Sequence, residues 1–158
     1  GNDGTTGRGN SVDKVTDEDG KVTSATYLGE YNIVEAFADA NIDVGIPLKF
    51  YGNYVMNNDA VDEDTGYLVG LTLGKAKDPG SFDFDYNYRH LENDAVVGAF
   101  TDSDSFGGGT DGEGHRISLG YQITKGLKGA ITYFLNEKAI SKDAIDYDRL
   151  QIDLSAKI

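Results

Sequence analysis

The chain has 158 residues, which is enough for one domain with a core and too few for two domains to be expected. Its net charge of -13, from 27 acidic and 14 basic side chains, argues against nucleic acid as a partner, because phosphates favour clustered Lys and Arg. The absence of cysteine excludes disulfides and thiolate chemistry. No apolar run approaches the roughly 18 residues of a transmembrane helix, whereas a membrane barrel needs only strands that alternate.

Residues 1–30 are expected to form a loop-like or hairpin N-terminal segment. Residues 1–20 are rich in Gly, Asp and Thr and show no periodicity. Residues 12–27 predict a short polar hairpin that turns at Asp19-Gly20. The start, GNDGTTGRGN, does not read as a signal peptide, so we expect either that a leader was removed or that the chain is a piece of something longer.

From Tyr31 onward the sequence predicts strands. In residues 81–90, SFDFDYNYRH, the even-numbered side chains from Phe82 to Tyr88 are all aromatic and the odd-numbered ones are polar. Successive side chains of a strand point to opposite faces, so one face is apolar and the other polar. The same period of two marks seven stretches: 31–44, 46–57, 66–75, 81–90, 115–124, 127–136 and 149–158. Helical periodicity is nowhere as strong, so an all-β fold is predicted.

The connections between these stretches alternate in length. Those around Val44-Gly45, at 77–80 and at 124–126 are tight, whereas those at 57–65, 92–114 and 137–148 are long and acidic. In an antiparallel up-and-down sheet, this order places all tight turns at one rim and all long loops at the other. Transmembrane β-barrels are built in this way, with short periplasmic turns and long extracellular loops.

The contents of the two faces favour a membrane barrel, with residues 31–158 as its strands. The polar face mixes both charges with small side chains, and the strand length of about 10 to 12 residues matches what crosses a tilted bilayer span. The predicted pore-lining residues are Glu35, Asp39, Asp43, Lys49, Asn53, Asp83, Asp85, Arg89, Arg116, Lys128, Arg149 and Asp153. The predicted lipid-facing girdle is Tyr54, Tyr67, Tyr88 and Tyr133. A soluble or surface β-barrel with a ligand-binding or structural role is the alternative, with its apolar face inside.

Seven antiparallel strands cannot close with an antiparallel seam, and an open edge in lipid would leave backbone groups unpaired. Either part of residues 20–29 supplies an eighth strand, or the chain is the C-terminal part of a larger barrel. We expect the second, because KVTSATYLGE is a poor bilayer-crossing strand.

The stretch YNYRHLENDAVVGAFTDSDSFGGGTDGEGH resembles a porin family of Gram-negative outer membranes. The segments LKFYGNYVMNNDA, GYLVGLTLGKAKDPGSF and RLQIDLSAKI are similar to the same family, so that the resemblance spans about residues 31–158. It implies an outer-membrane β-barrel that passes small hydrophilic solutes by diffusion. The terminal Ile158 departs from the Phe that usually ends an outer-membrane assembly signal.

The long connection after residue 91 allows two further hypotheses. Asp102, Asp104 and Glu113 have the spacing of calcium-loop ligands, although Phe106 occupies a ligand position and no helices flank them. The stretch therefore has two interpretations, a loop that binds Ca²⁺ and a solvated acidic loop without a metal. Alternatively, the apolar stretch AVVGAF lets residues 95–112 fold into the lumen and narrow the pore.

Catalysis has little support in the sequence. No Ser-His-Asp spacing and no phosphate-binding glycine loop occurs, and we expect no cofactor and no enzyme activity. His90 and His115, at the two ends of the long connection, are weak metal candidates. The expected partners are membrane lipid, small polar solutes, and either the remainder of the barrel or further copies of the chain.

Overall fold

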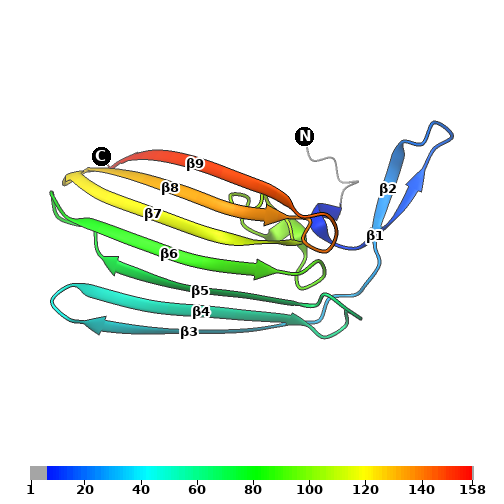
Figure 1. Cartoon of the computed structure of the whole chain (residues 1–158), viewed down its shortest axis with the longest axis horizontal. Helices are drawn as coiled ribbons and strands as arrows, with labels where there is room; N and C mark the ends of the chain where they lie inside the picture. Colours follow the sequence, from blue (N-terminus) through cyan, green and yellow to red (C-terminus); the bar gives the residue numbers. More distant parts are fainter. Residues whose placement is uncertain (1–6, 158) are drawn as a thin grey trace.

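The computed structural model describes residues 7–157, so the expectations that rest on the first residues and on Ile158 lie outside it. The described chain consists of antiparallel strands and two 3-10 turns (Figure 1). Its elements are η1 (Gly7–Gly9), β1 (Val12–Thr16), β2 (Val22–Tyr27), β3 (Ile33–Asp43), β4 (Pro47–Asn57), β5 (Thr65–Gly74), β6 (Phe82–Leu91), η2 (Gly98–Phe100), β7 (Gly112–Thr124), β8 (Leu127–Lys138) and β9 (Ile145–Ala156).

The main sheet has seven strands in the order of the sequence, β3 to β9, each antiparallel to its neighbours. The predicted all-β, up-and-down antiparallel sheet is thereby confirmed. Two strands begin earlier than the alternation indicated, β7 at Gly112 and β9 at Ile145. The reason is that backbone pairing continues past the apolar residues: Glu113 lies opposite both His90 and Glu137. Alternation reports side-chain environment, whereas hydrogen bonds set where a strand starts.

The tight turns gather at one end of the sheet and the long loops at the other (Figure 1). Gly45 and Gly80 have φ of 94° and 88° in two of the tight turns, a conformation that glycine adopts without steric cost. The turn before β4 is further closed by the Gly45 amide, which donates to the Asp43 carboxylate at 2.9 Å. The alternation of short and long connections therefore places both ends as predicted.

Strands β1 and β2 form a separate two-stranded sheet, which lies beside the long-loop end. The alternative that residues 20–29 supply an eighth strand is therefore wrong, since β2 pairs with β1 and not with β3. Within the described residues, β3 and β9 each have a neighbour on one side only.

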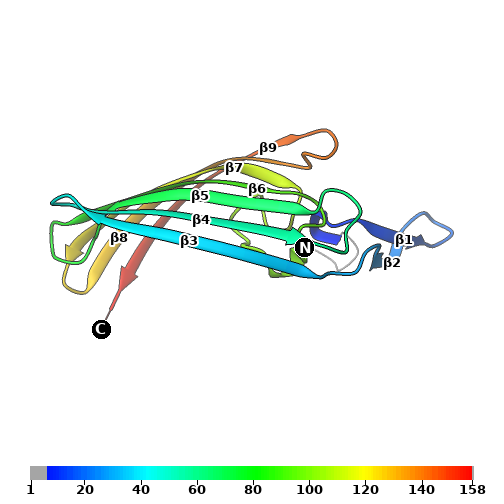
Figure 2. The ribbon, with the colours of Figure 1, turned by 90° about the horizontal axis from the view of Figure 1, so that it is seen from below.

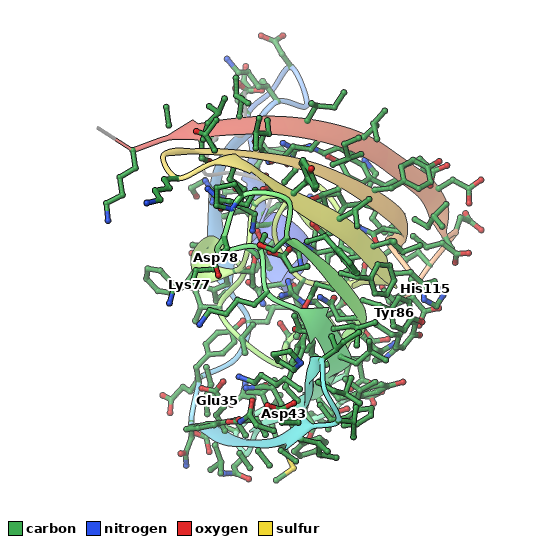
Figure 3. All side chains as sticks on the ribbon, turned by 90° about the vertical axis from the view of Figure 1, so that its left-hand side faces the viewer. Glu35, Asp43, Lys77, Asp78, Tyr86 and His115 are labelled. Carbon is green, nitrogen blue, oxygen red and sulfur yellow. The ribbon has the colours of Figure 1, made fainter. Side chains whose placement is uncertain are left out.

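The seven-stranded sheet is curved, so its two faces differ in shape. Seen along the strands it forms an open arc, with Glu35 and Asp43 on the inner side and Tyr86 and His115 on the outer side (Figure 3). The face that carries Glu35 is called the concave face below, and the face that carries Tyr86 the convex face. Figure 2 shows the same curvature from another side, with the β6–β7 loop lying against the sheet.

Burial is reversed relative to a water-soluble β-protein. The buried apolar side chains are Val55, Leu91, Ala95, Phe106 and Phe134, which lie on the concave face or in the loop above it. The convex face exposes large apolar side chains, among them Val34, Ile42, Phe50, Tyr54, Tyr67, Val69, Phe82, Leu119, Tyr121, Ile131, Tyr133, Leu135, Leu150, Ile152 and Leu154. A continuous apolar surface of this extent marks a site that meets lipid or another protein.

No helix in the described part of the chain has the length and apolarity that a membrane-spanning helix needs.

Glycines on the concave face let long side chains cross a neighbouring strand. Tyr51 of β4 lies over Gly70 of β5 and reaches β6, and a Cβ at Gly70 would come within 2.6 Å of the Tyr51 hydroxyl and 2.8 Å of the Asn87 Cβ. Lys128 crosses Gly120 in the same way, where a Cβ would lie 2.6 Å from the lysine Cε. The interstrand polar bonds of this face depend on these gaps.

Replacing Gly70 with alanine should lower the free energy of unfolding by about 1–3 kcal/mol, because the added methyl group displaces the Tyr51 ring. The measurement is urea unfolding of the protein in detergent micelles. Gly52→Ala is the matched control, since its Cβ would meet nothing nearer than the Leu68 carbonyl at 3.6 Å. Equal unfolding midpoints for the two variants would show that Tyr51 does not cross β5.

Candidate functional site

The strand register brings all of the predicted pore-lining residues to one face, the concave one. Opposed pairs such as Asp39 with Tyr51 and Phe37 with Asn53 fix the phase of β3 and β4, and the later strands follow it. The residues placed there are Glu35, Asp39, Asp43, Lys49, Asn53, Asp83, Asp85, Arg89, Arg116, Lys128, Arg149 and Asp153. The face thus collects charges from six of these seven strands, β5 contributing only uncharged side chains.

Asp85 is the centre of the densest hydrogen-bond network on this face. Its Oδ1 accepts from Arg116 Nη1 at 2.7 Å, and its Oδ2 accepts from Tyr51 Oη at 3.0 Å and Thr72 Oγ1 at 2.8 Å. Donors from β4, β5 and β7 therefore converge on one carboxylate of β6. Hydrogen bonds to a charged acceptor are stronger than neutral ones, so this network fixes the middle of the concave face.

Other charges of the concave face are also paired across strands. Lys128 Nζ lies 2.6 Å from Asp83 Oδ2, and Lys49 Nζ lies 3.7 Å from Asp39 Oδ2. By contrast, Asp153 accepts from the amide of Gln151 on its own strand, at 3.0 Å. These side chains stay partly exposed, which leaves them in contact with solvent along the face.

The β6–β7 loop folds over the concave face (Figures 2 and 3), and the narrowing of a pore by this loop stays a prediction. Arg149 Nη1 of β9 donates to Asp104 Oδ1 at 2.8 Å, and Arg89 Nη1 of β6 lies 3.7 Å from Asp102 Oδ2. Acidic side chains of the loop thus meet basic side chains of the sheet. The loop also leaves space beneath it.

Two hollows lie beside the loop. One, of about 740 Å³, is lined by Glu35, Arg89 and Asp102 together with apolar side chains of the sheet and loop, including Phe100. The second, of about 230 Å³, is more polar and includes Arg116 and Asp153. Both are lined by charged groups of either sign.

The loop rests on the small hydrophobic core of the molecule. Phe106 is 4% exposed and clusters with Val55, Leu91 and Ala95. Its ring packs directly on the backbone of Gly112, where a Cβ would come within 2.5 Å of the ring. Apolar burial of this kind stabilises the loop against leaving the sheet.

The mouth of the site, at the long-loop rim, is strongly acidic. Burial raises the pKa of the Glu63 carboxyl above its usual range, and the nearby charge of Asp111 raises it further, as do Asp62, Glu92 and Asp94. Like charges close together favour the protonated form. The rim therefore carries a negative field.

The predicted girdle residues all lie on the convex face. Tyr54 is opposite Tyr67, and the rings of Tyr67 and Tyr88 are 6.1 Å apart. Tyr133 lies apart from them, opposite Leu150 of β9.

The girdle continues into a polar cluster that sequence reasoning missed. Tyr88 Oη donates to Glu113 Oε2 at 2.8 Å, His90 Nδ1 lies 2.7 Å from the same oxygen, and His115 Nδ1 lies 2.9 Å from the hydroxyl of Tyr86. Aromatic rings with polar tips are typical of a membrane-water boundary.

The apolar band of the convex face slants across the register. The row that begins at Ala36 continues through Tyr54, Tyr67, His90, Glu113 and Glu137 to Asp146, from apolar to acidic. On the convex side of β3, the exposed apolar side chains begin at Val34, which lies nearer the long-loop end than this row. On the convex side of β9 they begin only at Leu150, which lies nearer the tight-turn end than the row. Strands that tilt by roughly 35–45° in a barrel bring such a band level.

The calcium hypothesis loses its ligand set in the structure. Asp102 and Asp104 lie over the concave face, whereas Glu113 belongs to the convex cluster. Among the residues that the structure describes, no group of three ligating side chains could hold a metal ion. His90 and His115 both lie on the convex face and contact tyrosine rings.

Sequence reasoning missed several partners on the concave face. Alternation does put Tyr51, Thr72 and Asn87 on the polar face with Lys49 and Asp85, but it does not show the hydrogen bonds that these three side chains make. Phe134 is 2% exposed and lies beside Arg149 on the concave face. Alternation of apolar and polar residues does not predict this position, because Phe134 is apolar like its neighbours on the convex face.

Comparison with known proteins identifies a family for this chain. A family model described as "Putative porin" matches residues 21–158, which include every strand of the seven-stranded sheet. No curated protein and no solved structure matches the chain. Because the family match covers nearly the whole sequence, the chain belongs to this porin family.

Proposed function

We propose that the chain forms the wall of a water-filled pore in a bacterial outer membrane, through which small hydrophilic solutes diffuse. The observation that carries the proposal is the reversed polarity of the sheet: a charged concave face with exposed ion pairs and a convex face of exposed apolar side chains. The family supports a channel rather than an enzyme.

The concave face supplies what a polar solute needs in place of bulk water. Lys128 with Asp83 and Arg116 with Asp85 alternate the sign of charge along the face, and Asp102 and Asp104 add acidic groups from the loop. Side chains of opposite sign around a water-filled path orient polar solutes and set ion selectivity. Acidic side chains outnumber basic ones when Asp102 and Asp104 of the loop are counted with the face, so a preference for cations is expected.

The convex face suits lipid. Its apolar band extends along most of each strand, and the girdle tyrosines and the His90–Glu113 cluster lie toward the long-loop rim. In outer-membrane barrels, aromatic residues flank the apolar band at the interfaces. The free edges of β3 and β9 require further strands, because lipid offers no hydrogen bonds to an open edge.

The number of added strands is constrained by direction. Strands β3 and β9 both run from the long-loop end to the tight-turn end, because an even number of antiparallel steps separates them. An antiparallel closure therefore needs an odd number of further strands, from the rest of a longer chain or from a partner. The alternative, a soluble or surface barrel that binds a ligand, would bury the convex side chains and expose the concave ones.

The protein, purified together with the strands that close its sheet, should require detergent to stay in solution and should give stepwise current increments in planar bilayers. The expected result follows from the exposed apolar band and the charged concave face. A chain that remains monomeric in the aqueous fraction without detergent, and that gives no current steps, would contradict the pore and favour the soluble barrel.

Charge substitutions on the concave face should shift ion selectivity in opposite directions. Arg116→Gln removes a positive charge and should raise the preference for cations, whereas Asp153→Asn should lower it. The measurement is the reversal potential in a potassium chloride gradient. Glu137→Gln, a charge removal on the convex face, is the control and should leave the potential unchanged. Equal shifts for all three variants would contradict the assignment of the concave face to the lumen.

A further inference from the structure

The segment Gly7–Ser11, called the clasp below, contacts the β6–β7 loop although more than eighty residues separate them in sequence. In Figures 1 and 2 the two segments lie side by side at the long-loop end. The contacts fall on two parts of the loop, residues 93–98 (the outgoing limb) and residues 109–110 (the returning limb). Asp102 and Asp104 lie between these two limbs.

Asn10 binds the outgoing limb with its whole amide group. Its Nδ2 donates to the carbonyls of Asn93 and Val96, each at 2.7 Å, and its Oδ1 accepts from the Gly98 amide at 2.8 Å. The side chain is 5% exposed, so water does not replace these bonds. A buried amide that is satisfied in this way is costly to remove, because its partners are left without hydrogen bonds.

Asp94 strengthens the same junction from the loop. Its Oδ1 accepts from the Ser11 amide at 2.9 Å and from the Tyr31 hydroxyl at 3.2 Å. Burial of Tyr31, together with the charge of Asp94, raises the pKa of the hydroxyl above its usual range, so Tyr31 stays a hydrogen donor.

Arg8 binds the returning limb through its backbone. Its carbonyl accepts from the Thr110 amide at 2.9 Å. The approach is so close that a Cβ on Gly109 would collide with the Arg8 carbonyl and one on Gly9 with the Thr110 carbonyl. Bare backbone on both sides is what permits this contact.

We propose that the clasp closes the neck of the β6–β7 loop and so holds Asp102 and Asp104 against Arg89 and Arg149, with Asn10 as the positioning residue of the pore constriction. The inference rests on the proposed pore. Ion pairs of partly exposed groups contribute little alone, at about 0–1 kcal/mol each. The 3.7 Å pair of Arg89 with Asp102 therefore does not fix the loop. The packing of Phe106 seats the loop on the sheet, and the buried bonds of Asn10 hold its neck.

Two variants open the clasp from opposite sides. Asn10→Ala removes the three amide bonds, and Asp94→Ala removes the acceptor of Ser11 and Tyr31. Asn58→Ala, at an exposed position of the same rim, is the matched control. Because a variant that simply fails to fold would be uninformative, only protein whose urea midpoint in micelles stays near that of the original chain enters the comparison; Asp94→Ala serves if Asn10→Ala does not.

Two measurements are made on each protein in lipid. Chymotrypsin should cut after Phe100, a loop residue that is 89% exposed, at least about ten times faster in the clasp variants. A tenfold factor matches the net loss of one hydrogen bond, and each variant loses more than one. Single-channel conductance should rise and become noisier, since the loop no longer stays across the lumen. The control should change neither quantity.

The outcomes separate the clasp from the pore. If the original chain gives no current but the variants are cut faster, the proposed pore fails while the closure of the loop neck stands. Unchanged cleavage in the variants would overturn the clasp. Faster cleavage with unchanged conductance in a chain that conducts would overturn the positioning role of Asn10.

Discussion

The pairing register of the seven strands is the constraint on which the rest of the structure depends. Because side chains alternate across each strand, one phase shared by β3 to β9 is enough to place all of the predicted pore-lining residues on one face and the apolar band on the other. A slip of one residue in any strand would put charges such as Asp85 among the convex apolar side chains. The glycines under Tyr51 and Lys128 reinforce this phase, since they fit only where the crossing side chain meets them.

The interior of this molecule is therefore not its hydrophobic side. Its small apolar core, around Phe106, serves to seat a loop, and the large apolar surface faces outward. The concave face is held by charge-assisted bonds, of which the network at Asp85 is the densest. Such bonds tolerate water, so the face is ordered while remaining wet. This combination of a rigid wall and a solvated surface is what the proposed diffusion of solutes requires.

Much of this arrangement could be predicted from sequence, because an alternation of period two shows directly which residues share one face of the sheet. Parity placed residues from Glu35 to Asp153 on one face, and the order of short and long connections placed the two rims. What alternation could not give was contact between distant segments. The pairing of Asp104 with Arg149 and the clasp at Asn10 depend on how an irregular loop folds back, and no local pattern encodes that. Glu113 lies in β7 ahead of the first apolar residue of that strand, so alternation does not mark it as part of a strand. The sequence therefore places it in the long connection with the calcium-loop candidates, whereas it contacts His90 in the structure.

The central claim, that the concave face meets water and the convex face meets lipid, can be tested on β3, whose side chains are exposed on both sides. The chain has no cysteine, so single cysteines can be placed from Ala36 to Asn41 and treated with a water-soluble maleimide in lipid bilayers. Labelling should occur at positions 37, 39 and 41 and not at 36, 38 and 40. Phe37 is decisive because it is apolar, is 81% exposed and lies on the concave face. Labelling of the even positions in place of the odd ones, or of all positions equally, would contradict the account.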